Sequence, residues 1–242
     1  MIVAIPSMGR AGRVNSLCVI PSATVFVPEP EADQYRVAHP SATVVGVPER
    51  VRGITATRNW ILDYAAEEGQ RWVVQIDDDV RMARWYEFLP FRVRQRKLRE
   101  EEWLAVWQRL FEVAEGLGYR IWGVDTQGAT RGVYPFRPFI WQTYVTGSCM
   151  GIRVDTGIRF DESFAVKEDY ELTLRCITED GGVVGARFVQ WVCSHWADEG
   201  GCRSYRTEEL ERDCTERLMT RYPGLIRRVK KGGSEWSIEL NF

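Results

Sequence analysis

Apolar runs alternate with amphipathic segments through the first 125 residues of the chain. The pattern predicts strands near 1–6, 23–28, 43–47, 72–76 and 119–124, and helices near 31–38, 54–68 and 101–117. Such a β-α-β rhythm favours a largely parallel sheet with helices on both faces. Ligands of these sheets bind outside the carboxyl ends of the strands, so the side chains that follow the strands are the first candidates for a site.

The pattern is less regular beyond residue 125. Glycine and proline punctuate 128–138, and an extended, strand-like run covers 141–154. We expect a helix near 168–178, a strand near 182–193, a helix near 207–221 and a short strand near 236–240. No internal repeat and no linker composition marks a boundary, so one α/β domain over residues 1–242 is the expected architecture.

Lysine and arginine (32) nearly balance aspartate and glutamate (34) in this chain of 242 residues, which gives a net charge of −2. This balance excludes a globally basic nucleic-acid binder but allows a local basic patch. The segment 91–99 carries such a patch, with Arg92, Arg94, Arg96, Lys97 and Arg99. It is either a solvated loop that leads into a helix or a contact for a phosphate backbone.

The six cysteines, at positions 18, 149, 176, 193, 202 and 214, follow no regular spacing. Neither a zinc module nor a disulfide framework is indicated, and reduced, mostly buried thiols are expected. The apolar start of the chain lacks a preceding basic region, so it predicts a strand and not a secretion signal. No stretch approaches the roughly 20 apolar residues of a membrane span, so we expect a cytoplasmic protein.

Three adjacent carboxylates, Asp77, Asp78 and Asp79, end the apolar run 72–76. Like charges this close repel, so the triplet is expected to bind a cation or a proton, unless it is a solvated turn. If the strand continues through the triplet, Asp77 and Asp79 point to one side about 6.6 Å apart and Asp78 points to the other. Oxygen ligands in that arrangement suit a hard divalent cation, Mg²⁺ or Mn²⁺.

Two other charged segments are candidates for the same edge of the sheet. Arg58 falls in the first turns of the helix at 54–68, where its guanidinium can pair with a diphosphate or form a structural ion pair with an aspartate. Glu168, Asp169 and Glu171 crowd the start of the helix near 168–178. They either stabilise the helix dipole, or Asp169 acts as a general base that accepts a hydroxyl proton.

The chain has two histidines, His39 and His195. His39 precedes a proline at the end of a predicted helix and is expected at the surface. His195 follows an apolar strand, and it is either a packed core residue or a metal ligand that completes a site at Asp79. Gly147 and Ser148 interrupt a strand-like run, which indicates either the close approach of a substrate to the backbone or a bulge.

The order of these segments resembles the GT-A class of nucleotide-sugar-dependent glycosyltransferases. The segments VAIPSMGR, GITATRNWILDYA, WVVQIDDDV, TGSCMG, KEDYEL and SHW follow one another over nearly the whole chain. Within that class, the opening I-P-S, the R-N helix, Q-I-D-D-D and E-D-Y-E are most similar to the TET-associated glycosyltransferases. That group is found mainly in phages and is related to the kinetoplastid base-J glucosyltransferase.

The resemblance implies a GT-A fold in which residues 1–125 bind the nucleotide sugar and residues 126–242 bind the acceptor. It further implies a phage-encoded protein of the host cytoplasm and a role for each matching residue. Nucleotide binding is implied for Pro6, Ser7, Arg10, Arg58, Asp77 and Asp78, metal binding for Asp79 and His195, acceptor contacts for Gly147, Ser148 and Glu168, and general-base catalysis for Asp169.

The implied reaction moves a sugar, with glucose expected first, from UDP-glucose or a related UDP-sugar to a hydroxymethylated pyrimidine in DNA. Mn²⁺ or Mg²⁺ neutralises the leaving diphosphate, and deprotonation of the acceptor by Asp169 predicts inversion, although retention stays open. The target base must be extruded or presented from a single strand. Arg92–Arg99, Arg131 and Arg137 are candidates for phosphate contacts. Stacking on the base or packing in the core are the two alternatives for Tyr134, Phe136, Phe139 and Trp141.

Other functions remain as alternatives. Within glycosyltransferases, the main rival acceptor is a glycan or a protein side chain, which a slightly acidic chain favours. Phosphohydrolases of the haloacid dehalogenase type also place D-x-D after an apolar strand, but they carry Thr or Val where this chain has Arg81. A sugar-nucleotide-binding domain without catalysis is the non-enzymatic alternative. The donor sugar and the oligomeric state are left open by the sequence.

Overall fold

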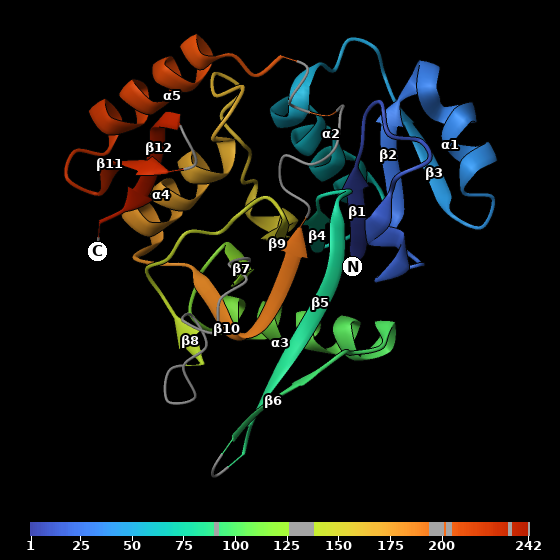
Figure 1. Ribbon diagram of the computed structural model, residues 1–242, viewed down its shortest axis with the longest axis horizontal. Coiled ribbons are helices and arrows are strands. Elements are labelled where there is room, and N and C mark those ends of the chain that lie inside the picture. Colours follow the sequence, from blue (N-terminus) through green and yellow to red (C-terminus); the bar gives the residue numbers. More distant parts are fainter. Residues whose placement is uncertain (90–91, 126–137, 194–200, 202–204, 232–233, 242) are drawn as a thin grey trace.

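A ten-stranded sheet runs through the computed structural model, which describes residues 1–89, 92–125, 138–193, 201, 205–231 and 234–241. Its strand order is β3-β2-β1-β4-β9-β7-β10-β5-β6, and β8 pairs with β10 (Figure 1). The strands are β1 (Ile2–Pro6), β2 (Thr24–Pro28), β3 (Thr43–Val47), β4 (Trp72–Ile76), β5 (Val80–Leu89), β6 (Arg92–Arg96), β7 (Ile121–Asp125), β8 (Phe139–Ile140), β9 (Cys149–Arg153) and β10 (Val184–Cys193).

Most of these strands share one direction. β1, β2, β3 and β4 pair in parallel, and β7 pairs in parallel with β10. β9 runs antiparallel between β4 and β7, so the two parallel groups point the same way. The α/β fold that the sequence predicted, with a mostly parallel central sheet, is confirmed, and the carboxyl ends of β1 to β4 lie along one edge.

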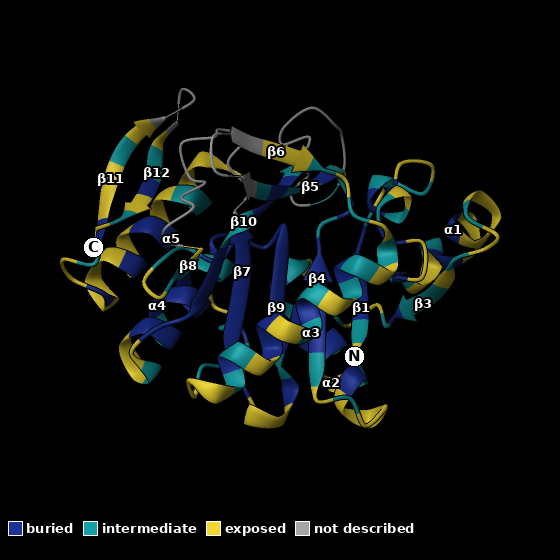
Figure 2. Cartoon of the chain, turned by 90° about the horizontal axis from the view of Figure 1, so that it is seen from below, coloured by how far each residue is buried: buried dark blue, intermediate teal, exposed yellow. Residues whose placement is uncertain are grey.

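Helices cover both faces of the sheet. They are α1 (Ala32–Ala38), α2 (Gly53–Glu67), α3 (Glu100–Gly116), α4 (Glu168–Asp180) and α5 (Glu208–Arg221). α1 and α3 pack on one face, where Trp103 and Trp107 of α3 meet Trp191 of β10, and α2 and α4 pack on the other. Figure 2 shows the resulting pattern, with buried central strands and helices that are exposed on their outer sides.

The end of the chain forms a smaller unit beside α4. It consists of α5 and a hairpin of β11 (Ile226–Lys231) and β12 (Ser234–Leu240). A separate hydrophobic cluster joins this C-terminal unit to α4, through Leu174 of α4, Leu218 of α5 and Ile238 of β12 among others. The predicted final strand is confirmed as β12, whereas β11 was not predicted.

Two predictions about local structure were wrong. The basic segment 91–99 is not a loop, because residues 92–96 form β6 and pair with β5 in a hairpin that projects from the sheet (Figure 1). Its alternating arginines fit a ribbon that lies mostly in solvent, a setting in which apolar periodicity gives no strand signal. The predicted long strand at 141–154 is also wrong, since only β9 and the short β8 nearby pair with other strands.

The remaining expectations about the chain have mixed outcomes. Phe139 packs edge-on against Phe188, which favours its core alternative, and Trp141 is 40% exposed. Arg131, Tyr134, Phe136 and Arg137 lie outside the described residues. The five cysteines that the structure describes are free thiols. None of the helices in the described ranges has the length and apolar character that crossing a bilayer requires.

A substitution at Gly151 of β9 can test how closely the centre of the sheet is packed. A Cβ atom at this position would come within 2.0 Å of the fully buried Trp122 ring. We therefore expect Gly151→Ala to lower the free energy of unfolding by about 2 kcal/mol or more in urea denaturation, because a close-packed core has no room for it. Gly116→Ala is the matched control, since nothing lies within 4 Å of its Cβ position. Equal stabilities for the two variants would contradict this packing.

Candidate active site

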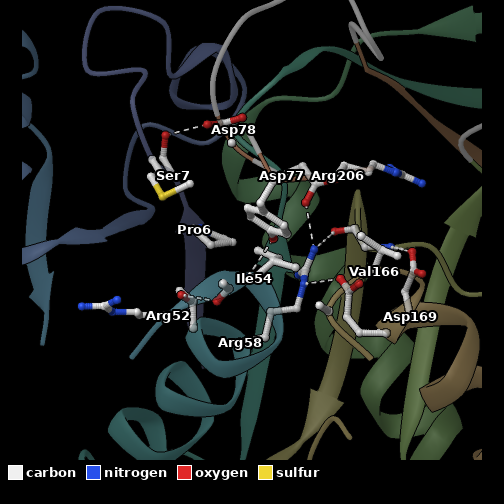
Figure 3. Close-up of a pocket in the computed structure, with 18 of the residues that line it drawn as sticks. Pro6, Ser7, Arg52, Ile54, Arg58, Asp77, Asp78, Val166, Asp169 and Arg206 are labelled. Carbon is white, nitrogen blue, oxygen red and sulfur yellow. Dashed lines mark hydrogen bonds and ion pairs between the residues drawn. The ribbon is translucent and has the colours of Figure 1, made fainter. Parts of the chain in front are cut away.

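A pocket of about 950 Å³ opens at the edge of the sheet where β1 to β4 end and where α2 and α4 begin (Figure 3). Every described residue that the sequence predicted for the site lines it: Pro6, Ser7, Arg10, Arg58, Asp77, Asp78, Asp79, Gly147, Ser148, Glu168 and Asp169. His195 lies outside the described residues. The structure therefore brings together segments that are far apart in the sequence, from Pro6 to Asp169.

The acidic triplet lies in a turn, the second of the two alternatives that the sequence left open, so the arrangement considered for a continuing strand does not apply. β4 ends at Ile76, and β5 begins at Val80. A short 3₁₀ helix at 15–18 supplies the reason, because the Ser16 hydroxyl donates to the Asp77 carbonyl and accepts from the Val80 amide. The turn directs Asp77 and Asp78 to different partners.

Asp78 points into a buried hydrogen-bond network. Its carboxylate accepts from the Ser7 hydroxyl at 2.5 Å and from Arg10 Nη1 at 2.6 Å. The Tyr35 hydroxyl lies 2.9 Å from the Ser7 hydroxyl and accepts from the Arg10 amide. Burial raises the pKa of Asp78, and the bonds from Ser7 and Arg10 oppose that rise. Ser7 and Arg10 thus line the pocket while they hold an aspartate in place.

Arg58 is the most heavily bonded side chain at the centre of the pocket, and it is only 2% exposed. Its guanidinium donates to Asp77 at 2.9 Å and to Glu168 at 3.3 Å. It also donates to the Gln75 side chain at 3.0 Å and to the Gly147 carbonyl at 3.3 Å. Of the two interpretations left open by the sequence, the structural ion pair is the one that this geometry displays.

The close contact with Arg58 requires a glycine at position 147. A Cβ atom at residue 147 would come within 2.5 Å of Arg58 Nη2. The close approach to the backbone that the sequence indicated is therefore made by a guanidinium of the protein itself. Gln75 is a polar residue within the otherwise apolar strand β4. It is the sequence signal that could have predicted a buried polar partner such as Arg58, because a buried amide needs hydrogen-bond partners.

Asp169 is half-buried and oriented by three donors. Its carboxylate accepts from the Tyr144 hydroxyl, from the Gly147 amide at 3.0 Å and from the Tyr170 amide at 2.9 Å. Tyr144 stacks on Tyr170 with ring centroids 3.9 Å apart, and burial, followed by the charge of Asp169, raises the pKa of Tyr144. Sequence reasoning missed Tyr144, since no spacing rule connects it to residue 169.

Glu168 and Asp169 are adjacent but lie in different environments. Burial and the charge of Asp169 raise the pKa of Glu168 to about 7, and the Arg58 guanidinium opposes this rise. Glu168 is thus able to hold a proton near neutral pH, and a protonated Glu168 adds no second negative charge beside Asp169.

Asp79 completes the triplet. It is half-buried, and together with Asp77 it helps to raise the pKa of the Cys193 thiol, for which burial is the main cause. No group of three His, Cys, Asp or Glu side chains within the described ranges is arranged to hold a metal ion.

Comparison with known proteins gives a family match and several similar folds. Residues 1–196 match the family model described as "TET-Associated Glycosyltransferase". No curated protein matches the chain in sequence. Among solved structures, S. aureus TarS 1-349 is 13% identical with a TM-score of 0.44, and the match covers 90% of this chain but only 66% of that one.

Two other solved structures match over nearly their whole length. A nucleotide-diphospho-sugar transferase from Desulfovibrio desulfuricans G20 is 9% identical with a TM-score of 0.45, and the match covers 91% of this chain and 97% of that one. The 4-diphosphocytidyl-2C-methyl-D-erythritol synthase of Anaerococcus prevotii DSM 20548 is 10% identical with a TM-score of 0.45, and the match covers 89% and 95%.

Glu168 links the stability of the protein to pH. The pKa of Glu168 is about 7 in the folded protein, whereas the ordinary pKa of a glutamate is 4.5. Between these two pH values the unfolded chain loses this proton while the folded protein keeps it, so a rise in pH favours the unfolded chain. The stability of the wild type relative to Glu168→Gln is therefore expected to fall by about 3 kcal/mol as pH rises through this window. Urea denaturation at several pH values measures the difference. The exposed Glu101→Gln serves as the control, and a pH-independent difference for Glu168→Gln would contradict the assignment.

Proposed function

We propose that this chain, which belongs to the TET-associated glycosyltransferase family, transfers glucose from UDP-glucose or a related UDP-sugar to a hydroxymethylated pyrimidine in DNA, with inversion. It is a glycosyltransferase by that membership, and the donor, the acceptor and the stereochemistry are the proposal. The observation that carries it is the convergence of Asp169 and the acidic triplet on one pocket, with Arg58 between them (Figure 3).

The donor is proposed to bind between the ends of β1 and β3 and the start of α2. Pro6 and Ser7 lie on this side of the pocket, and Pro48 and Val51 add apolar surface suited to a planar nucleobase. Asp77 would accept from the ribose hydroxyls, and Asp78 with Arg10 would lie next to the donor sugar. Arg58 is then a positioning residue that acts through Asp77 and Glu168.

A divalent cation, Mn²⁺ or Mg²⁺, is proposed to join the donor to the triplet. Carboxylate oxygens are the ligands that these hard cations prefer, and one or two carboxylates together with substrate phosphates commonly complete such a site. Asp79 lines the pocket and would be one ligand. The sequence resemblance implies His195, which lies outside the described residues, as a second ligand. The cation would neutralise negative charge on the diphosphate.

Asp169 is proposed to be the general base. It would take the proton of the acceptor hydroxyl while that oxygen bonds to the anomeric carbon of the sugar, from the face opposite the diphosphate. The bond from the anomeric carbon to the diphosphate oxygen breaks, and UDP leaves with the electron pair. The donors Tyr144 and Gly147 hold the carboxylate in one orientation for this step, which is how positioning lowers a barrier.

Two observations bear on the acceptor. Arg94, Lys97 and Arg99 are exposed on and beside the β5–β6 hairpin, which supports an anionic polymer such as DNA. Glu208 and Glu211 of α5 line one wall of the pocket together with Lys167 and Arg206, so the charges of this wall are balanced and offer a phosphate backbone little attraction. The second observation favours the alternative of a neutral glycan or a protein side chain as acceptor.

Variants of Asp169 and Asp79 are expected to change different quantities, the transfer rate for Asp169 and the Mn²⁺-dependent affinity for UDP for Asp79. Asp169→Asn is expected to keep the affinity for UDP and to lose about 10²- to 10⁴-fold in transfer rate, the usual contribution of a general base. Asp79→Ala is expected to abolish the gain in UDP affinity that Mn²⁺ gives. Calorimetry with and without Mn²⁺, followed by transfer assays, measures both. An unchanged Mn²⁺ dependence in Asp79→Ala would rule out this residue as a ligand.

The acceptor is identified with labelled UDP-glucose and three duplexes, which contain hydroxymethylcytosine, hydroxymethyluracil or neither. Labelling of a hydroxymethylated duplex alone is the expected result, and equal labelling of all three would exclude transfer to a modified base. Replacing Arg94 and Lys97 by serine is expected to lower the salt slope of duplex binding by about 1 for each lost contact. The matched control is Arg109→Ser, which removes an exposed arginine that lies on α3 and not on the hairpin.

A further inference from the structure

Lys167 has a backbone conformation that is unusual for its residue type. Its φ is 61°, and it is the one residue other than glycine with a positive φ in the ranges that the structure describes. A lysine in this left-handed region is disfavoured by contact between its Cβ atom and the backbone, so the surrounding structure must hold it there. Lys167 occupies the N-cap of α4, directly before Glu168 and Asp169.

The side chain of Lys167 is anchored by Glu211 of α5. The ammonium forms an ion pair with one carboxylate oxygen of Glu211, and Arg206 pairs with the other. The Lys167 side chain is 6% exposed and that of Glu211 is 12% exposed, so solvent screens this pair little. Glycine would adopt the same φ without strain, but it would have no group to bind Glu211.

The C-terminal unit that carries Glu211, and Tyr205 just before it in the chain, form hydrogen bonds to the elements around the pocket. The Tyr205 hydroxyl accepts from the Ile54 amide at the start of α2, at 3.2 Å. The Tyr170 hydroxyl donates to the Ile238 carbonyl of β12 at 3.0 Å. Tyr205, Arg206, Glu211 and Ile238 also line the pocket, and all of them follow residue 196, where the family match ends.

We propose that Lys167 and Glu211 are positioning residues, through which the C-terminal unit holds the Asp169 carboxylate in the place where it meets the acceptor hydroxyl. The conformation of residue 167 sets the direction in which the first turn of α4 leaves the preceding segment, and hence where the Asp169 carboxylate meets Gly147 and Tyr144. The anchored lysine keeps that conformation despite its strain. This inference rests on the proposed role of Asp169 as the base.

The test compares Glu211→Gln, Lys167→Gly and the double variant with the wild type. Turnover of UDP-glucose on a hydroxymethylcytosine duplex should fall on the order of 10- to 100-fold in kcat, while the KM for UDP-glucose stays unchanged. The reason is that, without the ion pair, residue 167 is free to leave its φ of 61°, and the base is displaced. The double variant should lose no more than the worse single variant, since the two residues act as one unit. Glu216→Gln, on the exposed side of α5, is the matched control.

Hydrogen exchange gives a readout that does not depend on turnover. The Gly147 and Tyr170 amides both donate to the Asp169 carboxylate, so they should exchange faster in Glu211→Gln than in the wild type. Lys167→Ala keeps the strain and loses the anchor, so it should melt below Lys167→Gly. This order shows that both variants fold and separates the strain from the ion pair.

The outcomes distinguish this inference from the proposed function. Wild-type exchange and wild-type kcat in Glu211→Gln would overturn the positioning role. Faster exchange of the two amides with an unchanged kcat would support the anchor and instead refute Asp169 as the base. If the wild type labels no hydroxymethylated duplex, the acceptor assignment fails, and the exchange experiment still decides whether Glu211 holds Asp169.

Discussion

The buried guanidinium of Arg58 is the interaction on which the rest of the site depends. It joins Asp77 after β4, Glu168 of α4 and the Gly147 carbonyl before β9, three segments that meet at the pocket. Removing a partner of this guanidinium would be costly, because a buried charge would be left without full compensation. The pocket therefore forms around a cation of the protein before any ligand is bound.

The surrounding acids are compatible with one another because each has its own environment. Asp78 is held by Ser7 and Arg10, Asp77 by Arg58, and Asp169 by hydroxyl and amide donors. Burial raises the pKa of Glu168 to about 7, so that it can stay neutral beside Asp169. A proton acceptor and an acidic triplet can therefore share one pocket, because hydrogen-bond donors and cations beside the carboxylates reduce the repulsion between them.

The sequence was informative where apolar periodicity and chain direction decide structure. The strands β1 to β4 and the helices α2, α3 and α4 were predicted within a few residues, because their buried faces repeat with the strand or helix period. β6 and β11 were missed, since most of their described side chains meet solvent. β5 was missed because its buried residues Val80, Ala83 and Tyr86 do not follow the two-residue period of a strand. The acidic triplet was found, and the sequence left open whether it is a turn. Ser16, which is 61 residues away, donates the bond to the Asp77 carbonyl that helps to form this turn.

The sequence by itself determined the α/β class, the edge of the sheet where the site lies and the acidic residues that line it, because these follow from local patterns and from strand direction. Only the tertiary structure decided that Arg58 binds Asp77 and Glu168, that Gly147 makes room for this arginine, and that Glu211 of α5 anchors Lys167. The physical reason is that a buried charge takes whichever partner the fold brings within hydrogen-bond distance, and such partners are far apart along the chain.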